Sequence, residues 1–578
     1  MQFEPTLALQ FEFTLPEGSC SFQSCLEDGD RLARLGCNLL RDRQGPMVLA
    51  VGRWPRRTTQ VNIAVGTLGR YGDHGHPVNR RRGASSVNGV AAMLSPWVIE
   101  EMGSSELNDK RLNDRLQTIV DQLGGHPSKS IPAACGGHAE TTAAYRFFDN
   151  DKVDFEAILQ PHIHKTIERM AAQPVVIVAQ DTTEVDLTRP EEQVQGAGLL
   201  DGNARYGAFL HPLVAFTPDG TPMGTVYAEV WARDDVPPES KTKEERDKKR
   251  KHTPIEEKES VRWVDTFKAA RDVASDVPET QCVHVADSEA DIYELLEESQ
   301  KEPQKLDWII RACRERALQK GEKSATSEHL RERVLAQQVL FSHTITVRGR
   351  KAKVSCEKRG RRQPRQSRTA EVEVRAASVT LRAPPRHDRK LTDISINVVL
   401  VTERNPRKND VPVEWILLTS LPIDDEEHVR KIIQYYCTRW MIEVFFRTLK
   451  SGCQVEDRQF EHIDRVLNCL AVYMVITWRT LFVCRLGREF PEISCEAVFE
   501  PDEWRSVYRV VRNEWPPSTP PTIREMVRLV AQLGGYVNRP RKDEPGPQTV
   551  WIGLQRLHDI ARCWRIFGPD TRNEQELV

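Results

Sequence analysis

The stretch KIIQYYCTRWMIEVFFRTLK, residues 431–450, decides the fold of this chain. At about 100° per residue, a helix through this stretch would have two unlike sides. One side is apolar, and the other carries Tyr436, Arg439, Glu443 and Lys450. The stretch therefore predicts one amphipathic helix that packs one side on a core and presents an aromatic ring, two cations and a carboxylate on the other. The alternative is an ordinary surface helix, in which an Arg439–Glu443 pair contributes a few tenths of a kcal/mol.

Two apolar stretches upstream each end on an aspartate. VVIVAQD ends on Asp181 and QCVHVAD ends on Asp287. Short apolar, β-branched runs are typical of buried central strands. Open α/β sheets bind their ligands at the carboxyl ends of such strands. Each aspartate alone could equally be a helix cap or a turn residue.

Together with Glu443, these aspartates suggest a catalytic metal site. Asp181, Asp287 and Glu443 lie far apart in sequence, so their contexts alone indicate that they meet. Hard carboxylate oxygens suit Mg²⁺ or Mn²⁺. Three carboxylates can hold two such ions about 3.5–4 Å apart for an in-line displacement at phosphorus. His211 lies within an apolar strand and is interpreted as a core histidine, not as a ligand.

Composition limits the remaining possibilities. A chain of 578 residues is expected to contain two to four domains. Its net charge of −2 gives no global reason to bind nucleic acid, so any DNA surface must come from local basic clusters. The 13 cysteines include no CxxC pair, which favours reduced thiols in a cytosolic protein. No signal peptide is predicted, and the apolar run 466–484 is expected to be a buried core helix.

The spacing Tyr436-x2-Arg439-x3-Glu443-x6-Lys450 resembles the Tyr-Arg-Glu-Lys signature of bacterial cut-and-paste DDE transposases, the "insertion sequence four" family. The resemblance extends over about 93–567. It implies an α/β fold: an RNase H-like catalytic domain with a β-rich insertion, a helical N-terminal DNA-binding domain and a helical C-terminal region. It also implies an enzyme that hydrolyses and transesterifies phosphodiesters with Mg²⁺ or Mn²⁺, using two ions.

The resemblance divides the chain into six segments. They are a poorly ordered or non-native extension (1–92), a helical transposon-end-binding domain (93–172), the first part of the catalytic domain (173–312), a β-rich insertion (313–425), the last catalytic helices (426–490) and a C-terminal helical dimerisation region (491–578). A chain that starts at Met93 is expected to keep its folding and activity. The Pro- and Trp-rich stretch 500–520 is expected to be irregular.

Several basic residues are expected to contact DNA outside the catalytic helix. The resemblance places Arg111, Arg115 and Arg146 of the N-terminal domain near DNA; the alternative is a helical bundle with exposed charges. The stretch 348–368 contains ten Lys or Arg and one acid. It could be a solvated hairpin edge or a phosphate-contacting ribbon. A similar basic stretch in the family favours the second interpretation, and the contact residues predicted there are Arg359 and Arg362.

The resemblance also implies DNA contacts around the catalytic site, from Arg311, Trp415, Tyr436, Arg439, Trp440 and Lys450. The tryptophan at position 415 is expected to stack on a base flipped from the transposon end. Flipping costs a few kcal/mol, and stacking on an aromatic ring returns about 1–3 kcal/mol. The alternative for Trp415 is an ordinary cross-strand aromatic contact.

The predicted activity is DNA transposition through end nicking, hairpin formation and strand transfer by a homodimer in a synaptic complex. Terminal inverted repeats and target DNA would be its partners, it would have no membrane partner, and its place would be the bacterial cytoplasm, with the nucleoid. Two alternatives remain open. One is a catalytically silent relative that represses transposition, and the other is a structure-selective Mg²⁺ nuclease of the same fold.

Overall fold

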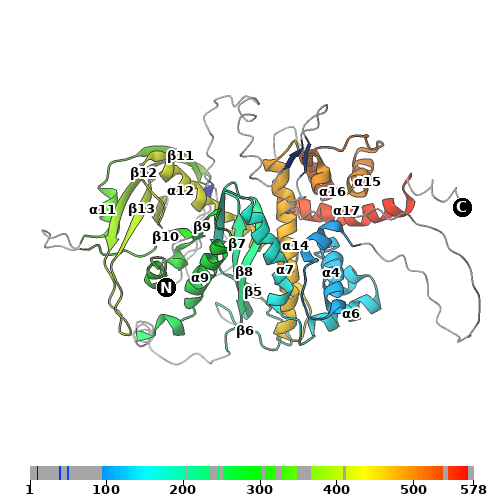
Figure 1. Cartoon of the computed structure of the whole chain (residues 1–578), viewed down its shortest axis with the longest axis horizontal. Coiled ribbons are helices and arrows are strands. Elements are labelled where there is room, and N and C mark those ends of the chain that lie inside the picture. The colour runs from blue at the N-terminus through cyan, green and yellow to red at the C-terminus, as the bar shows by residue number, and fades with distance from the viewer. Residues whose placement is uncertain are drawn as a thin grey trace, which may run out of the picture.

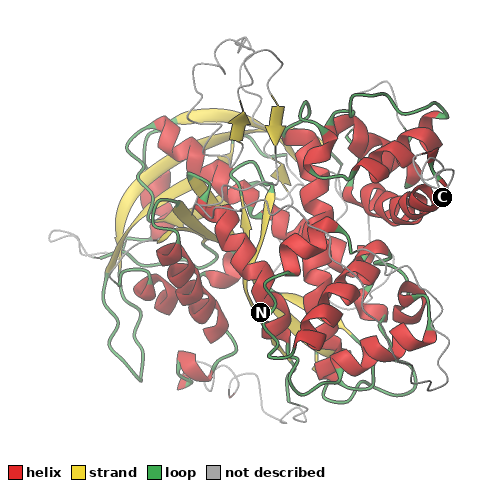
Figure 2. Ribbon diagram, turned by 45° about the vertical axis from the view of Figure 1, so that its right-hand side comes forward, coloured by secondary structure: helices red, strands yellow, loops and turns green. Residues whose placement is uncertain are grey.

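The structure is a computed structural model, and it describes residues 9–10, 38–40, 48–50, 94–201, 205–234, 245, 252–301, 306–319, 328–347, 366–407, 412–537 and 544–569. These parts form a mixed α/β body with one large sheet and helical regions near both ends of the chain (Figure 1). Figure 2 shows the strands gathered toward one side of the molecule and the terminal helical regions toward the other. The predicted mixed α/β fold with helical N- and C-terminal regions is therefore confirmed.

Twelve strands form the large sheet, in the order β1-β11-β12-β13-β14-β10-β9-β4-β7-β5, and β6 and β8 also pair with β7. They are β1 (Leu9–Gln10), β4 (Val175–Gln180), β5 (Thr183–Asp186), β6 (Gly198–Leu199), β7 (Tyr206–Phe216), β8 (Pro222–Trp231), β9 (Gln281–Ala286), β10 (Leu306–Arg311), β11 (Phe341–Val347), β12 (Arg368–Leu381), β13 (Ile394–Glu403) and β14 (Glu414–Thr419). Strand β9 lies between β4 and β10 and runs parallel to both. A separate two-stranded sheet consists of β2 (Asn38–Leu40) and β3 (Val48–Ala50).

The central part of the chain follows the predicted order of elements. Strands β4, β7 and β8 precede α9 (Val261–Asp276), which is followed by β9, α10 (Tyr293–Glu298) and β10. The two short strands β5 and β6 were not predicted. Both lie between β4 and β7 in sequence and pair with β7.

The insertion is β-rich, as predicted, but it continues the central sheet. Strand β14 pairs with β13 on one side and with β10 on the other, both antiparallel. The insertion also contains the helix α11 (Leu330–Leu335). The sequence shows the strands of an insertion but not which strand they join, because that pairing is a tertiary contact.

Helices cover both faces of the sheet and form both terminal regions. The N-terminal helices are α3 (Pro96–Met102), α4 (Lys110–Gly125), α5 (Ile131–Cys135), α6 (His138–Phe148) and α7 (Phe155–Ala171). The later helices are α12 (Glu426–Thr438), α13 (Trp440–Arg447), α14 (Ile463–Glu489), α15 (Pro501–Arg512), α16 (Ile523–Leu533) and α17 (Pro547–Phe567). Short turns of helix are η1 (Ile255–Glu257), η2 (Ser288–Ala290), η3 (Thr448–Gly452), η4 (Val455–Asp457) and η5 (Cys495–Ala497).

Alternate residues of the central strands belong to different cores. On β4, Ile177 and Ala179 join the core that contains α12, α13 and α14, whereas Val176 and Val178 join the core that contains α9 and α10. Successive side chains of a strand point to opposite faces of the sheet, which explains this division. By the same alternation, Asp181 follows the side of Ala179 and faces the α12–α13 helices.

A buried polar network fastens the N-terminal helices to the sheet. Arg169 of α7 donates through both terminal nitrogens to Glu101 of α3, at 2.8 and 2.9 Å. His162 Nδ1 lies 2.5 Å from Glu101 Oε1, and its Nε2 accepts from the backbone N–H of Thr225 on β8. The guanidinium of Arg169 also lies 4.2 Å from the centre of the Trp478 ring of α14. A carboxylate buried this deeply requires such partners.

Helix α14 passes through the middle of the molecule. It is long and apolar enough to cross a membrane by length and composition, and 83% of its most apolar window is buried inside the protein. Its side chains contribute to the core under the sheet and to the core of the C-terminal helices. Its sequence is therefore accounted for by packing within the chain, as expected of a core helix.

Two predictions about helices were wrong. Residues 431–450 do not form one regular α-helix. Helix α12 begins earlier, after its cap Asp425, and a change to i→i−3 hydrogen bonds at Arg439 separates α12 from α13, although Arg439 keeps helical backbone angles. A π-helical turn follows over 448–452. The stretch 500–520 is not irregular in its first half, because α15 occupies it. Its start carries a proline in the first turn and a Glu500–Glu503 capping box, both of which favour helix initiation.

Candidate active site

Asp181 and Asp287 stand at the same edge of the sheet. Strands β4 and β9 are parallel neighbours in register, with Gln180 opposite Ala286. Asp181 directly follows Gln180, and Asp287 directly follows Ala286. The shared register therefore brings the two carboxylates to adjacent positions at the carboxyl edge, which sequence spacing alone could not establish.

Arg439 joins this edge to the helix that carries Glu443. Its Nη1 donates to Asp181 Oδ2 at 2.9 Å, and its Nη2 lies 3.7 Å from Glu443 Oε1. The Arg439 side chain is 3% exposed, whereas that of Glu443 is 35% exposed. One buried guanidinium thus holds together a strand-end aspartate and a helical glutamate.

The charges at this site influence one another. Burial raises the pKa of Asp181 well above its usual value, repulsion from Asp287 and Glu443 raises it further, and Arg439 opposes both. Burial alone would lower the pKa of Arg439, but Tyr436 and the three acidic residues raise it above its usual value. The cluster therefore contains more negative charge than one guanidinium neutralises.

This excess of negative charge fits a cation. Asp181 Oδ1 accepts from the backbone N–H of Thr182, and Asp287 Oδ1 accepts from that of Glu289, both at 2.8 Å. Each aspartate is thus oriented by its own turn, and the oxygen donors are of the kind that Mg²⁺ and Mn²⁺ prefer. In the described ranges, no three Asp, Glu, His or Cys side chains form a ready-made metal cluster. Asp181 Oδ2 is engaged by Arg439 instead.

Two of the four side chains on the predicted polar side, Tyr436 and Arg439, are buried, which corrects the expectation that this whole side is presented outward. Tyr436 and Arg439 are 3% and 2% exposed. Tyr436 lies in the last turn of α12 and Arg439 is the residue directly after that helix, and both are packed inside the protein beside the sheet edge. The helical period identifies side chains that share a face, but only packing decides whether that face meets water or another polar element.

Lys450 lies in the π-helical turn η3, and its ammonium group contacts oxygen atoms of two other residues. Its Nζ donates to the backbone oxygen of Glu184 on β5 and lies 3.3 Å from Glu456 Oε1. The same Glu456 oxygen accepts from the backbone N–H of Asp186 at 3.0 Å. The sequence did not single out Glu456, which follows Lys450 by six residues and joins it to β5.

Trp415 packs in the core, against Tyr436. The two rings lie 5.3 Å apart at 70°, and Trp415 is 3% exposed. Trp415 also stands opposite Val401 across β13 and β14, as the cross-strand alternative requires. Its face is not offered to a flipped base in this structure, so its role in base stacking stays a prediction.

Arg311 ends β10 and is partly exposed. Its charge helps to oppose the rise that burial causes in the pKa of Tyr436, so it lies near that phenol. Within the part of the chain that the structure describes, the Arg311 side chain has no hydrogen-bond or ion-pair partner. Trp440 is also partly exposed, at the first turn of α13.

The N-terminal arginines predicted to contact DNA differ in whether they already form an ion pair within the protein. Arg111 is paired with Asp109 at 3.2 Å, and Arg115 with Glu140. Arg146, in the last turn of α6, is exposed and has no side-chain partner among the described residues. Arg359 and Arg362 lie outside the described residues.

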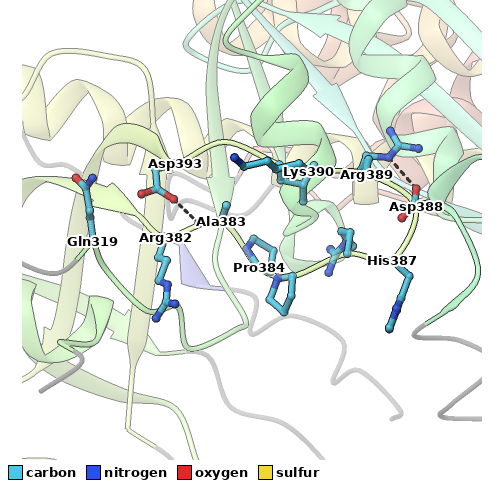
Figure 3. A pocket seen from close by; sticks show the side chains of 12 residues that line it. Gln319, Arg382, Ala383, Pro384, His387, Asp388, Arg389, Lys390 and Asp393 are labelled. Atoms are coloured by element: carbon cyan, nitrogen blue, oxygen red, sulfur yellow. Dashed lines mark hydrogen bonds and ion pairs between the residues drawn. The ribbon is translucent and has the colours of Figure 1, made fainter.

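A cavity of about 790 Å³ lies elsewhere, at the loop between β12 and β13. Its lining contains none of the three carboxylates of the candidate site. Figure 3 shows its side chains, with Arg389 bonded to Asp388 and Asp393 bonded to the backbone of Ala383. This cavity is therefore separate from the carboxylates, which form a site at a sheet edge.

Comparison with known proteins identifies three segments of the chain. Residues 95–153 match the family model "Transposase DNA-binding", residues 248–477 match "Transposase DDE domain", and residues 475–567 match "Transposase Tn5 dimerisation domain". A solved structure described as "Cryo-EM structure of piggyBac transposase synaptic complex with hairpin DNA (SNHP)" aligns at 10% identity with a TM-score of 0.30. It covers 71% of this chain and 58% of that one, and a similarity this low carries no argument here.

Over these three segments the chain is similar to DDE transposases of the Tn5 kind, and the matched models include a DNA-binding model and a dimerisation model. The DDE domain indicates an enzyme with nuclease or transposase activity, and such domains use divalent metal ions. Its matched range contains Asp287 and Glu443 but begins after Asp181. The assignment of Asp181 therefore depends on the geometry alone.

Proposed function

We propose that this protein is a cut-and-paste transposase of the "insertion sequence four" family, with an RNase H-like catalytic domain. The Tyr436-Arg439-Glu443-Lys450 signature and the order of strands and helices from β4 to β10 support this assignment. The domain boundaries given above are part of the proposal, including an extension over 1–92 that activity does not require. In that extension the structure describes only β1, β2 and β3, of which β1 pairs with β11.

The proposed reaction proceeds in four steps at the transposon end. Water first attacks a phosphorus atom and releases a 3′-hydroxyl. That hydroxyl attacks the opposite strand, forms a hairpin on the transposon and frees the flanking DNA. A second water opens the hairpin and regenerates the hydroxyl, which finally attacks target DNA and joins the two molecules. Each step exchanges one phosphorus–oxygen bond for another and needs no redox partner.

Asp181, Asp287 and Glu443 would hold the metal, Mg²⁺ or Mn²⁺, as two ions. The chemistry that such ions supply when bound is activation of the attacking oxygen and stabilisation of the leaving oxygen. Arg439 sets the direction of two of these carboxylates by bonding to Asp181 and lying beside Glu443. These residues supply the fixed charges, so little reorganisation is needed when the phosphate changes charge.

Cations around the carboxylates would grip the DNA backbone. The partly exposed Arg311 is available to a phosphate on one side, and Lys450 on the other side would exchange its bonds with Glu184 and Glu456 for a phosphate. We further propose that Trp440, Tyr436 and Trp415 contact the distorted end, which for the buried pair requires movement on DNA binding.

The partners proposed are terminal inverted repeats, target DNA and a second copy of this chain in a synaptic complex. The matched DNA-binding and dimerisation segments support the first and the last of these. The expected location is the bacterial cytoplasm, where the nucleoid supplies the DNA.

The single observation that carries the proposal is the contact of Arg439 with Asp181 and Glu443. The test is Glu443→Gln, assayed with end-containing DNA and Mg²⁺ for binding, nicking, hairpin formation and strand transfer. We expect end binding to persist and all cutting to stop. Arg447→Ala, an exposed position on the same helix, is the matched control and should cut at the wild-type rate.

The same assay separates the alternatives. A wild-type protein that binds ends and never cuts them would be a silent relative acting as a repressor. A wild-type protein that hydrolyses DNA without joining strands would be a structure-selective nuclease. Cutting by Glu443→Gln at the wild-type rate would remove Glu443 from the mechanism.

A further inference from the structure

Three strands carry a row of buried polar side chains directly behind the two aspartates. His211 of β7, Gln180 of β4 and His284 of β9 are all 0% exposed. Gln180 Nε2 lies 2.7 Å from His211 Nε2, and Gln180 Oε1 lies 2.5 Å from His284 Nε2. The row therefore crosses the strands that precede Asp181 and Asp287.

The row lies on the face of the sheet opposite the carboxylates. Gln180 and Thr182 flank Asp181 in sequence, so their side chains point to the other face, toward α9. His211 contacts both of them: its Nε2 meets Gln180, and its Nδ1 lies 2.7 Å from Thr182 Oγ1. One imidazole ring therefore bridges the residues on either side of Asp181.

The direction of each hydrogen bond follows from one fixed acceptor. Gln180 Nε2 donates to the backbone oxygen of Trp263 at 3.3 Å, which can only accept. The amide nitrogen must therefore face His211, and His211 Nε2 must accept. The proton of the neutral ring is then on Nδ1 and is donated to Thr182, while Gln180 Oε1 accepts from His284 Nε2–H.

The surroundings keep both rings neutral and fixed. Burial lowers the pKa of His211 to about 3, helped by Arg262 and His284, and burial lowers that of His284 to about 3. The Trp263 ring meets His211 edge-on at 4.8 Å, and Phe267 meets His284 edge-on at 5.1 Å. The row thus has one arrangement of donors and acceptors.

We infer that His211 is a positioning residue of the candidate active site: with Gln180 and His284 it clamps the strand ends that carry Asp181 and Asp287 and so sets the spacing of their carboxylates. This inference rests on the proposed function. The ring acts through the backbone, because Thr182 N–H donates to Asp181 Oδ1 while its hydroxyl is held by His211. Loss of the ring would free both neighbours of Asp181 without removing any carboxylate.

The test measures Mn²⁺ binding to the full-length protein directly, by the electron paramagnetic resonance signal of free Mn²⁺, beside DNA cleavage and thermal unfolding. We expect His211→Phe to raise the half-saturating Mn²⁺ concentration about tenfold, the lower end of what outer-shell substitutions cost in metal affinity. His211→Asn retains a donor near the Nδ1 position and should recover part of the affinity. End binding should remain at the wild-type level in both.

Leu213→Ala is the matched control, because Leu213 is buried on the same strand as His211 and its apolar side chain cannot hydrogen-bond to any member of the row, although its backbone stands opposite Gln180. It should lower thermal stability and leave Mn²⁺ affinity within twofold of wild type. If His211→Phe does not fold, Thr182→Val removes one arm of the clamp at a partly exposed site and should weaken Mn²⁺ binding about threefold.

Two results would overturn the clamp. One is a folded His211→Phe or Thr182→Val protein that binds Mn²⁺ as wild type does, and the other is an equal loss of affinity in Leu213→Ala. Failure of the proposed function would give a different result. In that case Glu443→Gln would bind as much Mn²⁺ as wild type does, and wild type would cut no DNA.

Discussion

Arg439 donates to Asp181 Oδ2 over 2.9 Å from a guanidinium that is almost completely buried. The two residues are separated by 258 positions in sequence, and each comes from a different layer of the fold. The contact therefore shows that the end of α12, which follows the insertion in sequence, packs against the sheet edge at Asp181. The same contact both holds the helix on the sheet and orients Asp181, one of the proposed metal ligands.

The first prediction concerns this contact. Arg439→Ala leaves the buried Asp181 carboxylate without its cation, and breaking such a pair costs about 3–5 kcal/mol of folding free energy. Arg439→Lys keeps the charge but loses the two-pronged geometry, so we expect a smaller loss of stability and at least a tenfold loss of nicking rate. Thermal unfolding and a nicking assay measure both effects. An Arg439→Lys protein that nicks at full rate would show that only the charge matters.

The second prediction concerns end recognition by the N-terminal helices. Arg146→Ala should weaken binding to end DNA and reduce the slope of log K against log salt by about 1, because Arg146 is exposed without a partner among the described residues. Arg111→Ala should have a smaller effect, since Arg111 is paired with Asp109. Titrations at several salt concentrations measure these slopes.

The control for end recognition is Lys165→Ala on α7, where the lysine is paired with Glu168. Its salt slope should equal that of wild type. An unchanged slope in Arg146→Ala would mean that α6 does not face DNA.

The third prediction concerns pH and the buried network of Glu101. Although burial alone would raise the pKa of Glu101, Arg169 and His162 lower it from 4.5 to about 2. The ionised form therefore stabilises the fold, fully above pH 4.5, and this contribution is lost as pH falls toward 2. Glu101→Gln should lower stability at pH 7 by about 3–5 kcal/mol, and the difference from wild type should shrink below pH 4.5.

Thermal unfolding between pH 3 and pH 7 tests this dependence. The neighbouring Glu100→Gln is the control, because Glu100 lies on the same helix and forms no ion pair within the described residues. Burial and repulsion from Glu101 raise the pKa of Glu100, so any pH dependence it adds has the opposite sign. A Glu101→Gln deficit that stays constant down to pH 3 would show that packing, not charge, holds α3 against α7.

The fourth prediction concerns Trp415. Trp415→Ala removes a buried ring that packs against Tyr436, so it should lower folding free energy by about 3–5 kcal/mol. If the ring also stacks on a flipped base, hairpin formation should slow more than nicking. Trp415→Phe should restore most of the stability and only part of the hairpin rate. Equal slowing of nicking and hairpin formation in a folded variant would show that Trp415 contributes only to the core and does not stack on a base.

The sequence by itself predicted the central strands and the candidate site residues. The apolar runs that end on Asp181 and Asp287 gave the strands, because short β-branched segments must be buried, and the spacing of the Tyr436–Lys450 signature indicated the class of enzyme. It also indicated a β-rich insertion, because alternation of apolar and polar residues is a local property.

Only the tertiary structure decided how those residues meet. The break at Arg439, the burial of Tyr436 and Trp415, and the continuation of the central sheet through β14 all depend on contacts between segments distant in sequence. The row behind the aspartates is of the same kind, since Gln180 and His284 have no sequence signal beyond an apolar strand. The pattern of apolar and polar residues along one segment determines whether that segment is a helix or a strand. The partner of each buried polar group depends instead on how the whole chain packs.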